Sequence, residues 1–157
     1  MTPRVAALVL CLVVAHLLLR VALGLGNESP DLFLLAVLIG SRHMGVCTGA
    51  ILGLVIGLLE DAFSVSSFGA TVFALTTLGA AGAQSRYFFV GKSVSFLVSY
   101  LALGKWLRDL LAWMVSDPAT RSAFGEHLLF ESPLTAVYTS VVGTVIALLV
   151  LKGSGRV

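Results

Sequence analysis

Six ionisable side chains lie inside or at the ends of strongly apolar stretches, where they could form buried ion pairs. Three are basic and three are acidic, so this polar layer is neutral overall: Arg20, Lys105, Arg108, Glu60, Asp61 and Asp109. A charge in apolar surroundings is costly unless it is paired. Lys105 and Asp109 have the four-residue spacing that places two side chains on one helix face. We predict that Asp61 pairs with one of the basic side chains.

The same residue types can act in catalysis, but their spacing here does not favour it. Hydrolases that work inside membranes need a Ser-Lys, Ser-His or Asp-Asp pair in one cavity. Ser99 and Lys105 are not spaced to share a helix face, and Asp61 and Asp109 could meet only across helices. The three histidines do not have the spacing of a metal triad: His16, His43 and His127. We expect a protein that is not an enzyme and that binds no metal or cofactor.

The composition predicts an integral membrane protein. The chain has 157 residues, of which 58% are hydrophobic and 11% charged, and the mean hydropathy is +1.02. Soluble domains carry about 25% charged residues, so there are too few charges here to coat a soluble globule of this size. The length allows one domain, 1–157. Cys11 and Cys47 are expected to be packing residues, and the absence of a basic run argues against nucleic-acid binding.

We predict an all-α polytopic bundle of six transmembrane helices. A helix needs about 20 residues to cross the hydrocarbon core of a membrane, or fewer where neighbouring helices help. The first span is expected to be retained rather than cleaved as a signal peptide. The second covers only ~14 Å at the helical rise, so it could also be a half-span or continue into the third. The expected spans are 5–25, 32–40, 44–59, 68–83, 93–115 and 134–151.

Basic residues flank both ends of the chain, which predicts that both ends are cytoplasmic. Arg4 precedes the first span, and Lys152 and Arg156 follow the last. Cytoplasmic loops collect such residues, so an even number of crossings is required. This orientation places the polar layer in the outer third of the bundle. The alternative to buried pairing is that these side chains snorkel to the outer interface, near Trp106 and Trp113.

Four glycines follow one another at four-residue spacing in the third span and form a glycine seam: Gly45, Gly49, Gly53 and Gly57. Residues four apart stay on one side of a helix, and small residues let membrane helices approach closely. The seam could receive a helix of another chain, or it could pack within the bundle against the fourth span, which is rich in Ala and Gly. Packing within the bundle is favoured, because such patterns are common in membrane helices.

The order of motifs over residues 28–85 closely resembles the MreD family of bacterial rod-shape proteins. In that family a Pro-Asp or Pro-Asn pair opens the second span. A glycine-containing helix then ends in Asp, which is followed after a short loop by Gly. The matching residues are Pro30, Asp31, Asp61 and Gly69. Residues 86–157 agree with the family only in the number of spans.

The resemblance implies a non-enzymatic scaffold in the bacterial cytoplasmic (inner) membrane. MreD-like proteins bind MreC, which has one transmembrane helix, and act with MreB, RodA and a class B penicillin-binding protein. Together these proteins organise peptidoglycan synthesis along the side wall. A groove in the bundle would receive the MreC helix. The residues expected to face anionic lipids and cytoplasmic partners are Arg42, Arg86 and Lys92.

The MreD fold is also similar to the substrate-binding subunits of vitamin transporters, which gives an alternative function of a different class. A small-molecule binding subunit would need an outward cavity with a few converging polar groups. Such a cavity could be lined by Arg20, Asp61 and Arg108. A membrane-embedded enzyme acting on lipid is a third, less favoured interpretation.

Overall fold

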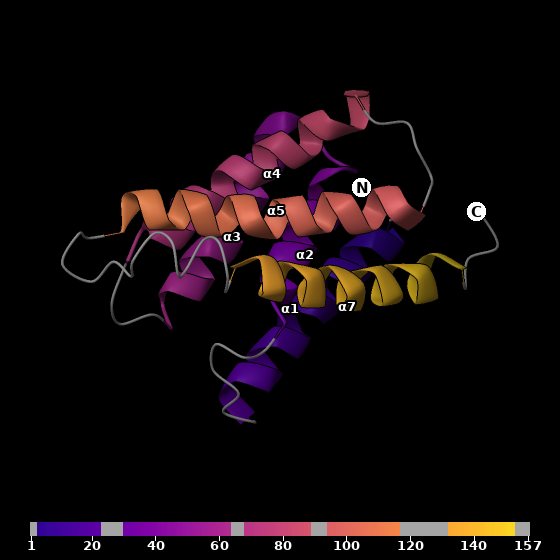
Figure 1. Cartoon of the computed structure of the whole chain (residues 1–157), viewed down its shortest axis with the longest axis horizontal. Helices are drawn as coiled ribbons and strands as arrows, with labels where there is room; N and C mark the ends of the chain where they lie inside the picture. Colours follow the sequence, from indigo (N-terminus) through magenta and orange to yellow (C-terminus); the bar gives the residue numbers. More distant parts are fainter. Residues whose placement is uncertain (1–2, 23–29, 64–67, 89–93, 117–131, 153–157) are drawn as a thin grey trace.

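The computed structural model describes residues 3–22, 30–63, 68–88, 94–116 and 132–152, and within them the chain is helical, with no strand. The six α-helices are α1 (Pro3–Leu17), α2 (Leu32–Ser41), α3 (Val46–Asp61), α4 (Ala70–Phe88), α5 (Val94–Val115) and α7 (Ser132–Lys152) (Figure 1). A π-helical turn, η1 (Leu18–Ala22), continues α1. Each predicted span overlaps one α-helix, so the all-α, six-helix prediction is confirmed for the described residues. A turn separates α2 from α3, so these segments are not one long helix.

Helix α2 lies at the centre of the structure. Its ten residues are all buried, and Phe33, Leu34 and Leu35 have no exposed surface. It contacts α1, α3, α4, α5 and α7. A helix that is apolar on every side is stable only where every side is covered, which explains the central position. At the helical rise, α2 is about 15 Å long, roughly half the hydrocarbon thickness of a membrane. It therefore has the length of a half-span.

Helices α2 and α5 run in opposite directions. Asp31, at the start of α2, pairs with Arg108 in the second half of α5. Arg42, directly after α2, lies over the ring of Phe96 near the start of α5, 5.1 Å from the ring centroid. In the same way α1 is antiparallel to α2. His16 near the end of α1 has its ring centroid 4.1 Å from that of Phe33 near the start of α2, whereas Val9 in the first half of α1 packs beside Gly40 near the end of α2.

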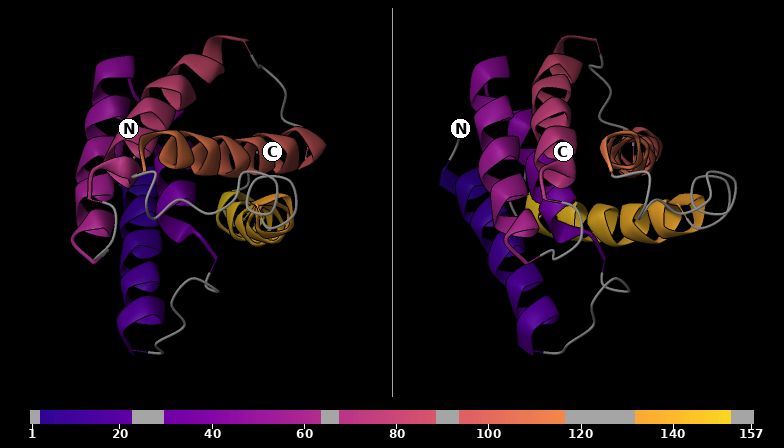
Figure 2. Two further views of the ribbon diagram at one scale, coloured as in Figure 1. Left: turned by 60° about the vertical axis from the view of Figure 1, so that its left-hand side comes forward. Right: turned by 90° about the vertical axis from the view of Figure 1, so that its left-hand side faces the viewer.

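The pairs α3–α4 and α5–α7 are antiparallel as well. Gly49 near the start of α3 contacts Gly79, whereas Gly57 near its end contacts Val72 at the start of α4. Ser132, the first residue of α7, bonds to Asp109 of α5. The start of α1 and the end of α7 consequently lie at the same end of the bundle, towards the right in Figure 1. The helices splay: in the right-hand view of Figure 2, α5 is seen almost end-on while α7 crosses the view.

Three glycines of the seam pack against α4. A Cβ atom added to Gly53 would overlap the carbonyl oxygen of Leu75, and one added to Gly49 or Gly57 would also collide with the α4 backbone. A Cβ atom at Gly45 would meet nothing within 4 Å, because this residue precedes α3 as its N-cap. The seam is thus a contact within the chain, as the favoured interpretation held. The other interpretation, docking of a second chain, is wrong for these three glycines because α4 already covers them.

One helical stretch in the described residues, 3–20, is long and apolar enough to cross a membrane by length and composition, and it lies near the N-terminus. Two shorter apolar helical stretches are Leu32–Ser41 and Ser132–Leu148. Large apolar side chains are exposed on several helices, among them Leu10 on α1, Ile51 on α3 and Val141 on α7. Membrane crossing by all six helices stays a prediction.

Replacing Gly53 by Ala should lower the unfolding temperature of the purified protein, because the new methyl group has to displace Leu75 and Thr76 of α4. Overpacking costs about 1–3 kcal/mol, whereas Ala gains roughly 1 kcal/mol over Gly in a helix. Gly45→Ala is the matched control and should cost less, since a methyl group there meets open space and only the preference for Gly over Ala at an N-cap is lost. Thermal unfolding in detergent measures both variants, and equal losses would contradict the α3–α4 contact.

Candidate functional site

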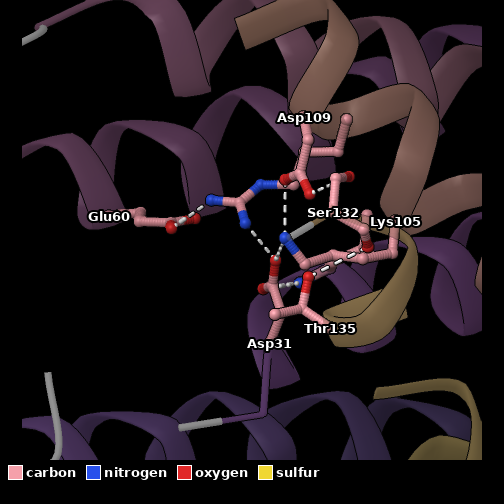
Figure 3. Close-up of polar contacts among 8 residues, drawn as sticks. Asp31, Glu60, Lys105, Asp109, Ser132 and Thr135 are labelled. Carbon is pink, nitrogen blue, oxygen red and sulfur yellow. Dashed lines mark hydrogen bonds and ion pairs between the residues drawn. The ribbon is translucent and has the colours of Figure 1, made fainter. Parts of the chain in front are cut away.

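Five ionisable side chains meet at one end of the bundle and form an ion-pair cluster, made up of Asp31, Glu60, Lys105, Arg108 and Asp109 (Figure 3). Arg108 bridges two of the carboxylates, because Nη1 donates to Asp31 Oδ2 and Nη2 donates to Glu60 Oε1. Asp31 is the N-cap of α2, Glu60 lies in the last turn of α3, and Arg108 is on α5. A guanidinium group has a fixed fork of donors, so this one side chain joins three helices.

The rest of the cluster joins α5 to α7. Lys105 Nζ lies 2.5 Å from Asp109 Oδ1, one helical turn further along α5, and 4.0 Å from Asp31 Oδ2. Asp109 Oδ2 accepts a hydrogen bond from Ser132 Oγ at 2.7 Å, which attaches the first residue of α7. The four-residue spacing of Lys105 and Asp109 predicted that these side chains share a helix face, and the ion pair confirms it.

The cluster is largely shielded from solvent. Exposed fractions of its side chains range from 7% for Asp31 to 14% for Arg108. Charges taken out of water to this extent need both opposite charges and hydrogen bonds to compensate for lost hydration. Of the two alternatives for the polar layer, Glu60, Lys105, Arg108 and Asp109 adopt buried pairing rather than snorkelling.

Asp61 does not belong to the cluster, and the ion pair predicted for it is wrong. Its Oδ2 atom accepts hydrogen bonds from the backbone N–H groups of Gly69 at 2.7 Å and Val72 at 3.3 Å. These N–H groups belong to the first turn of α4 and the residue before it, so Asp61 caps α4 from the end of α3. Gly69 has φ +100°, which glycine adopts at little cost. Reversing the charge at Asp61 should therefore not be compensated by reversing the charge at Arg108.

Arg20 also lies outside the ion pairs. Its Nη2 atom donates to the carbonyl oxygen of Phe63 at 3.4 Å, in an exposed position. This bond connects η1 to the turn that follows α3. The structure thus brings the polar layer to one end of the bundle, as predicted from helix depth, but only four of its six residues form ion pairs.

The sequence prediction missed that Asp31 belongs to the cluster. It assigned Asp31 only to the Pro30-Asp31 motif at the start of the second span. In the structure Oδ1 of Asp31 accepts the backbone N–H of Leu34 at 3.0 Å, which caps α2, while Oδ2 faces Arg108. The sequence feature that could have indicated this role is an Asp directly before an apolar helix, at the end of the bundle where Glu60 also lies. Ser132 carried no comparable signal, since a Ser before Pro is common in turns.

At the opposite end of the bundle, Arg42 stacks on aromatic rings of α5. Its guanidinium carbon lies 5.1 Å from the ring centroid of Phe96 and 5.3 Å from that of Tyr100, distances typical of cation–π contacts. Other residues named from the sequence lie outside the described residues or have no described side chain: Arg86, Lys92, His127, Lys152 and Arg156.

The described residues contain no group of three or more His, Cys, Asp or Glu placed to hold a metal ion. No family model matches the chain, and no significant match was found among curated proteins or among solved structures. The resemblance to MreD therefore rests on the sequence motif and stays a prediction. The geometry gives three residues of that motif a physical role, since Asp31 and Asp61 are helix caps and Gly69 takes the turn that the second cap requires.

Arg108→Met should destabilise the protein strongly, because it removes the guanidinium that pairs with the buried Asp31 and donates to the buried Glu60. Breaking a buried pair in this way costs about 3–5 kcal/mol. Arg20→Met is the matched control at the same end of the bundle, and loss of its exposed hydrogen bond should cost no more than about 1 kcal/mol. Thermal unfolding in detergent compares the two variants. A loss for Arg108→Met no larger than for Arg20→Met would show that the cluster does not hold the helices together.

Proposed function

We propose that this protein is a non-enzymatic scaffold of the MreD type, embedded in the bacterial cytoplasmic membrane by six helices with both ends cytoplasmic. In this role it binds the transmembrane helix of MreC. It acts with MreB, RodA and a class B penicillin-binding protein to organise peptidoglycan synthesis along the side wall. The observation that carries the proposal is the contact between Asp61 and Gly69, two residues of the motif on which the resemblance rests.

The contact between Asp61 and Gly69 gives a physical reason for these two residues of the motif. An Asp at the end of one helix can cap the next helix only if the loop has the right length and the receiving residue tolerates a positive φ. Asp61 and Gly69 meet both conditions, with a hydrogen bond of 2.7 Å and φ +100° at the glycine. If Asp61 and Gly69 matched the motif by chance, they would not be expected to form one hydrogen-bonded helix cap.

The location in a membrane is supported by composition and by helix direction. The chain is 58% hydrophobic and 11% charged, and apolar side chains such as Leu10, Ile51 and Val141 are exposed. Lipid tails would cover these side chains without cost. The alternation of helix direction along the chain is what successive membrane crossings require, and six crossings would place both chain ends on one side. The short α2 is compatible with this location because other helices enclose it. A helix that ends within the hydrocarbon layer is tolerated where protein surrounds its ends.

MreC must bind away from the glycine seam, because α4 fills that surface. The other side of α3 exposes Ile51, Val55 and Leu58, and α7 exposes Val141 and Val145. These two apolar faces are available either to lipid or to a partner helix. We assign the MreC contact to one of them.

Co-expression with the MreC chain of the same organism should yield a complex that survives purification in detergent. A single cysteine at Ile51 or Val141 should then form a disulfide with a cysteine scanned along the MreC helix. A cysteine at Ala74, which has no exposed surface, is the control and should not react. Failure to recover a complex in several detergents would contradict the scaffold role, and saturable binding of a small molecule by the chain alone would favour a transporter subunit.

Cysteine labelling tests the membrane arrangement separately. Cys11 and Cys47 are exposed, so both are first replaced by Ser. Single cysteines introduced as Arg4→Cys and Arg156→Cys should react with a membrane-impermeant maleimide only after the cytoplasmic face is opened. Labelling of one of them from the outside would overturn the six-crossing arrangement, whatever the result with MreC.

A further inference from the structure

Of the three carboxyl groups in the ion-pair cluster, Glu60 has the fewest hydrogen-bond and ion-pair partners among the described residues. Asp31 accepts from Leu34 N and Arg108 Nη1, and Lys105 lies 4.0 Å away. Asp109 accepts from Lys105 Nζ and Ser132 Oγ. Among the described residues, Glu60 accepts only from Arg108 Nη2, through Oε1.

The second oxygen of Glu60 is buried and has no donor. Its Oε2 atom forms no hydrogen bond within the described part of the chain, although the side chain is only 10% exposed. Figure 3 shows that the Glu60 carboxyl group points into the cluster rather than away from it. Leaving a buried charged oxygen without a donor costs the desolvation free energy of that group, so an ionised Glu60 is poorly accommodated.

The balance of charges at this end of the bundle also indicates that an ionised Glu60 is unfavourable. The cluster contains two basic and three acidic side chains. Among the described residues, the other charged or titratable groups near the cluster are Arg20 and His16 on the α1–η1 segment and Asp61 on α3. The described side chains of α4 and of the facing side of α7 contribute none. Among the described groups, counting Arg20 and Asp61 leaves one negative charge in excess when every carboxyl group is ionised and His16 is uncharged. Buried uncompensated charge is unfavourable.

We propose that Glu60 is a proton-binding site and is a neutral carboxylic acid in the folded protein at neutral pH. The proton comes from the surrounding water and binds at Oε2, while Oε1 continues to accept from Arg108. The cluster then contains equal numbers of positive and negative charges. This site is independent of the MreD assignment and of any contact with MreC.

Asp61 is the other carboxyl group with a buried oxygen that lacks a donor, since Oδ1 has none among the described residues. It differs from Glu60 in that Oδ2 accepts two backbone N–H groups at the start of α4. The positive end of a helix dipole stabilises an anion there. We therefore assign the proton to Glu60, whose second oxygen lacks such backbone donors among the described residues.

Infrared spectroscopy of the purified protein at neutral pH tests the assignment directly. The wild-type protein should show a carbonyl-stretch band of a protonated carboxyl group, and labelling with 13C-glutamate should shift this band. Glu60→Gln should abolish the band, whereas Glu126→Gln, a matched change outside the described residues, should retain it. Glutamine has the shape of a protonated Glu, so Glu60→Gln should unfold at nearly the wild-type temperature.

Stability as a function of pH gives a second measurement. A protonated Glu60 means that the native state binds one proton that the unfolded chain has released at neutral pH, since an exposed Glu titrates near ~4.3. The free energy of unfolding must then fall as pH rises and this proton is lost. The wild-type protein should lose more stability than Glu60→Gln between neutral and alkaline pH.

Three results would overturn the proposal. One is a wild-type spectrum without a protonated carboxyl band that responds to 13C-glutamate, which decides the question even if Glu60→Gln does not fold. Another is a band that persists unchanged in folded Glu60→Gln. The third is a band that disappears when Na⁺ replaces K⁺ at constant pH, because the ligand would then be a metal cation rather than a proton.

Discussion

The interaction on which the rest of the structure depends is the bridge from Arg108 to Asp31 and Glu60. Helix α2 is apolar on every side, and the hydrophobic contacts that bury it are non-directional. A guanidinium group, in contrast, has donors in fixed directions. Because Asp31 is also the N-cap of α2, the bridge sets the position of the central helix relative to both α3 and α5.

The pairing of α3 with α4 depends on two structural features, the glycine seam and the Asp61 cap. The glycine seam lets the two backbones touch, but residues four apart present nearly the same surface, so a shift by one turn would look similar to the partner. The hydrogen bond from Gly69 to Asp61 allows only one alignment. Glycine spacing therefore determines how close the helices lie, and the cap determines how they align.

The sequence predicts the helices well because long apolar runs separated by Gly, Pro and charged residues are local signals. Lys105 and Asp109 were predictable for the same reason. The partner of Asp61 was not, since Glu60 and Asp61 are neighbours that point about 100° apart on a helix, and sequence does not show which one faces α5. Asp31 and Arg108 are 77 residues apart, so their contact depends on the direction and tilt of two helices.

The short central helix explains why polar residues occur where they do in this apolar chain. A helix of ten residues enclosed by protein exposes unpaired backbone groups at both ends in a place with little water. At one end Asp31 caps the N–H of Leu34, and Arg108 neutralises the cap. At the other end the Tyr100 hydroxyl donates to the carbonyl oxygen of Leu38 at 3.3 Å, and Arg42 stacks nearby on α5. Longer helices can end at the surface of the bundle, where water satisfies these groups. Because both ends of α2 are buried, α5 carries polar side chains near each of them.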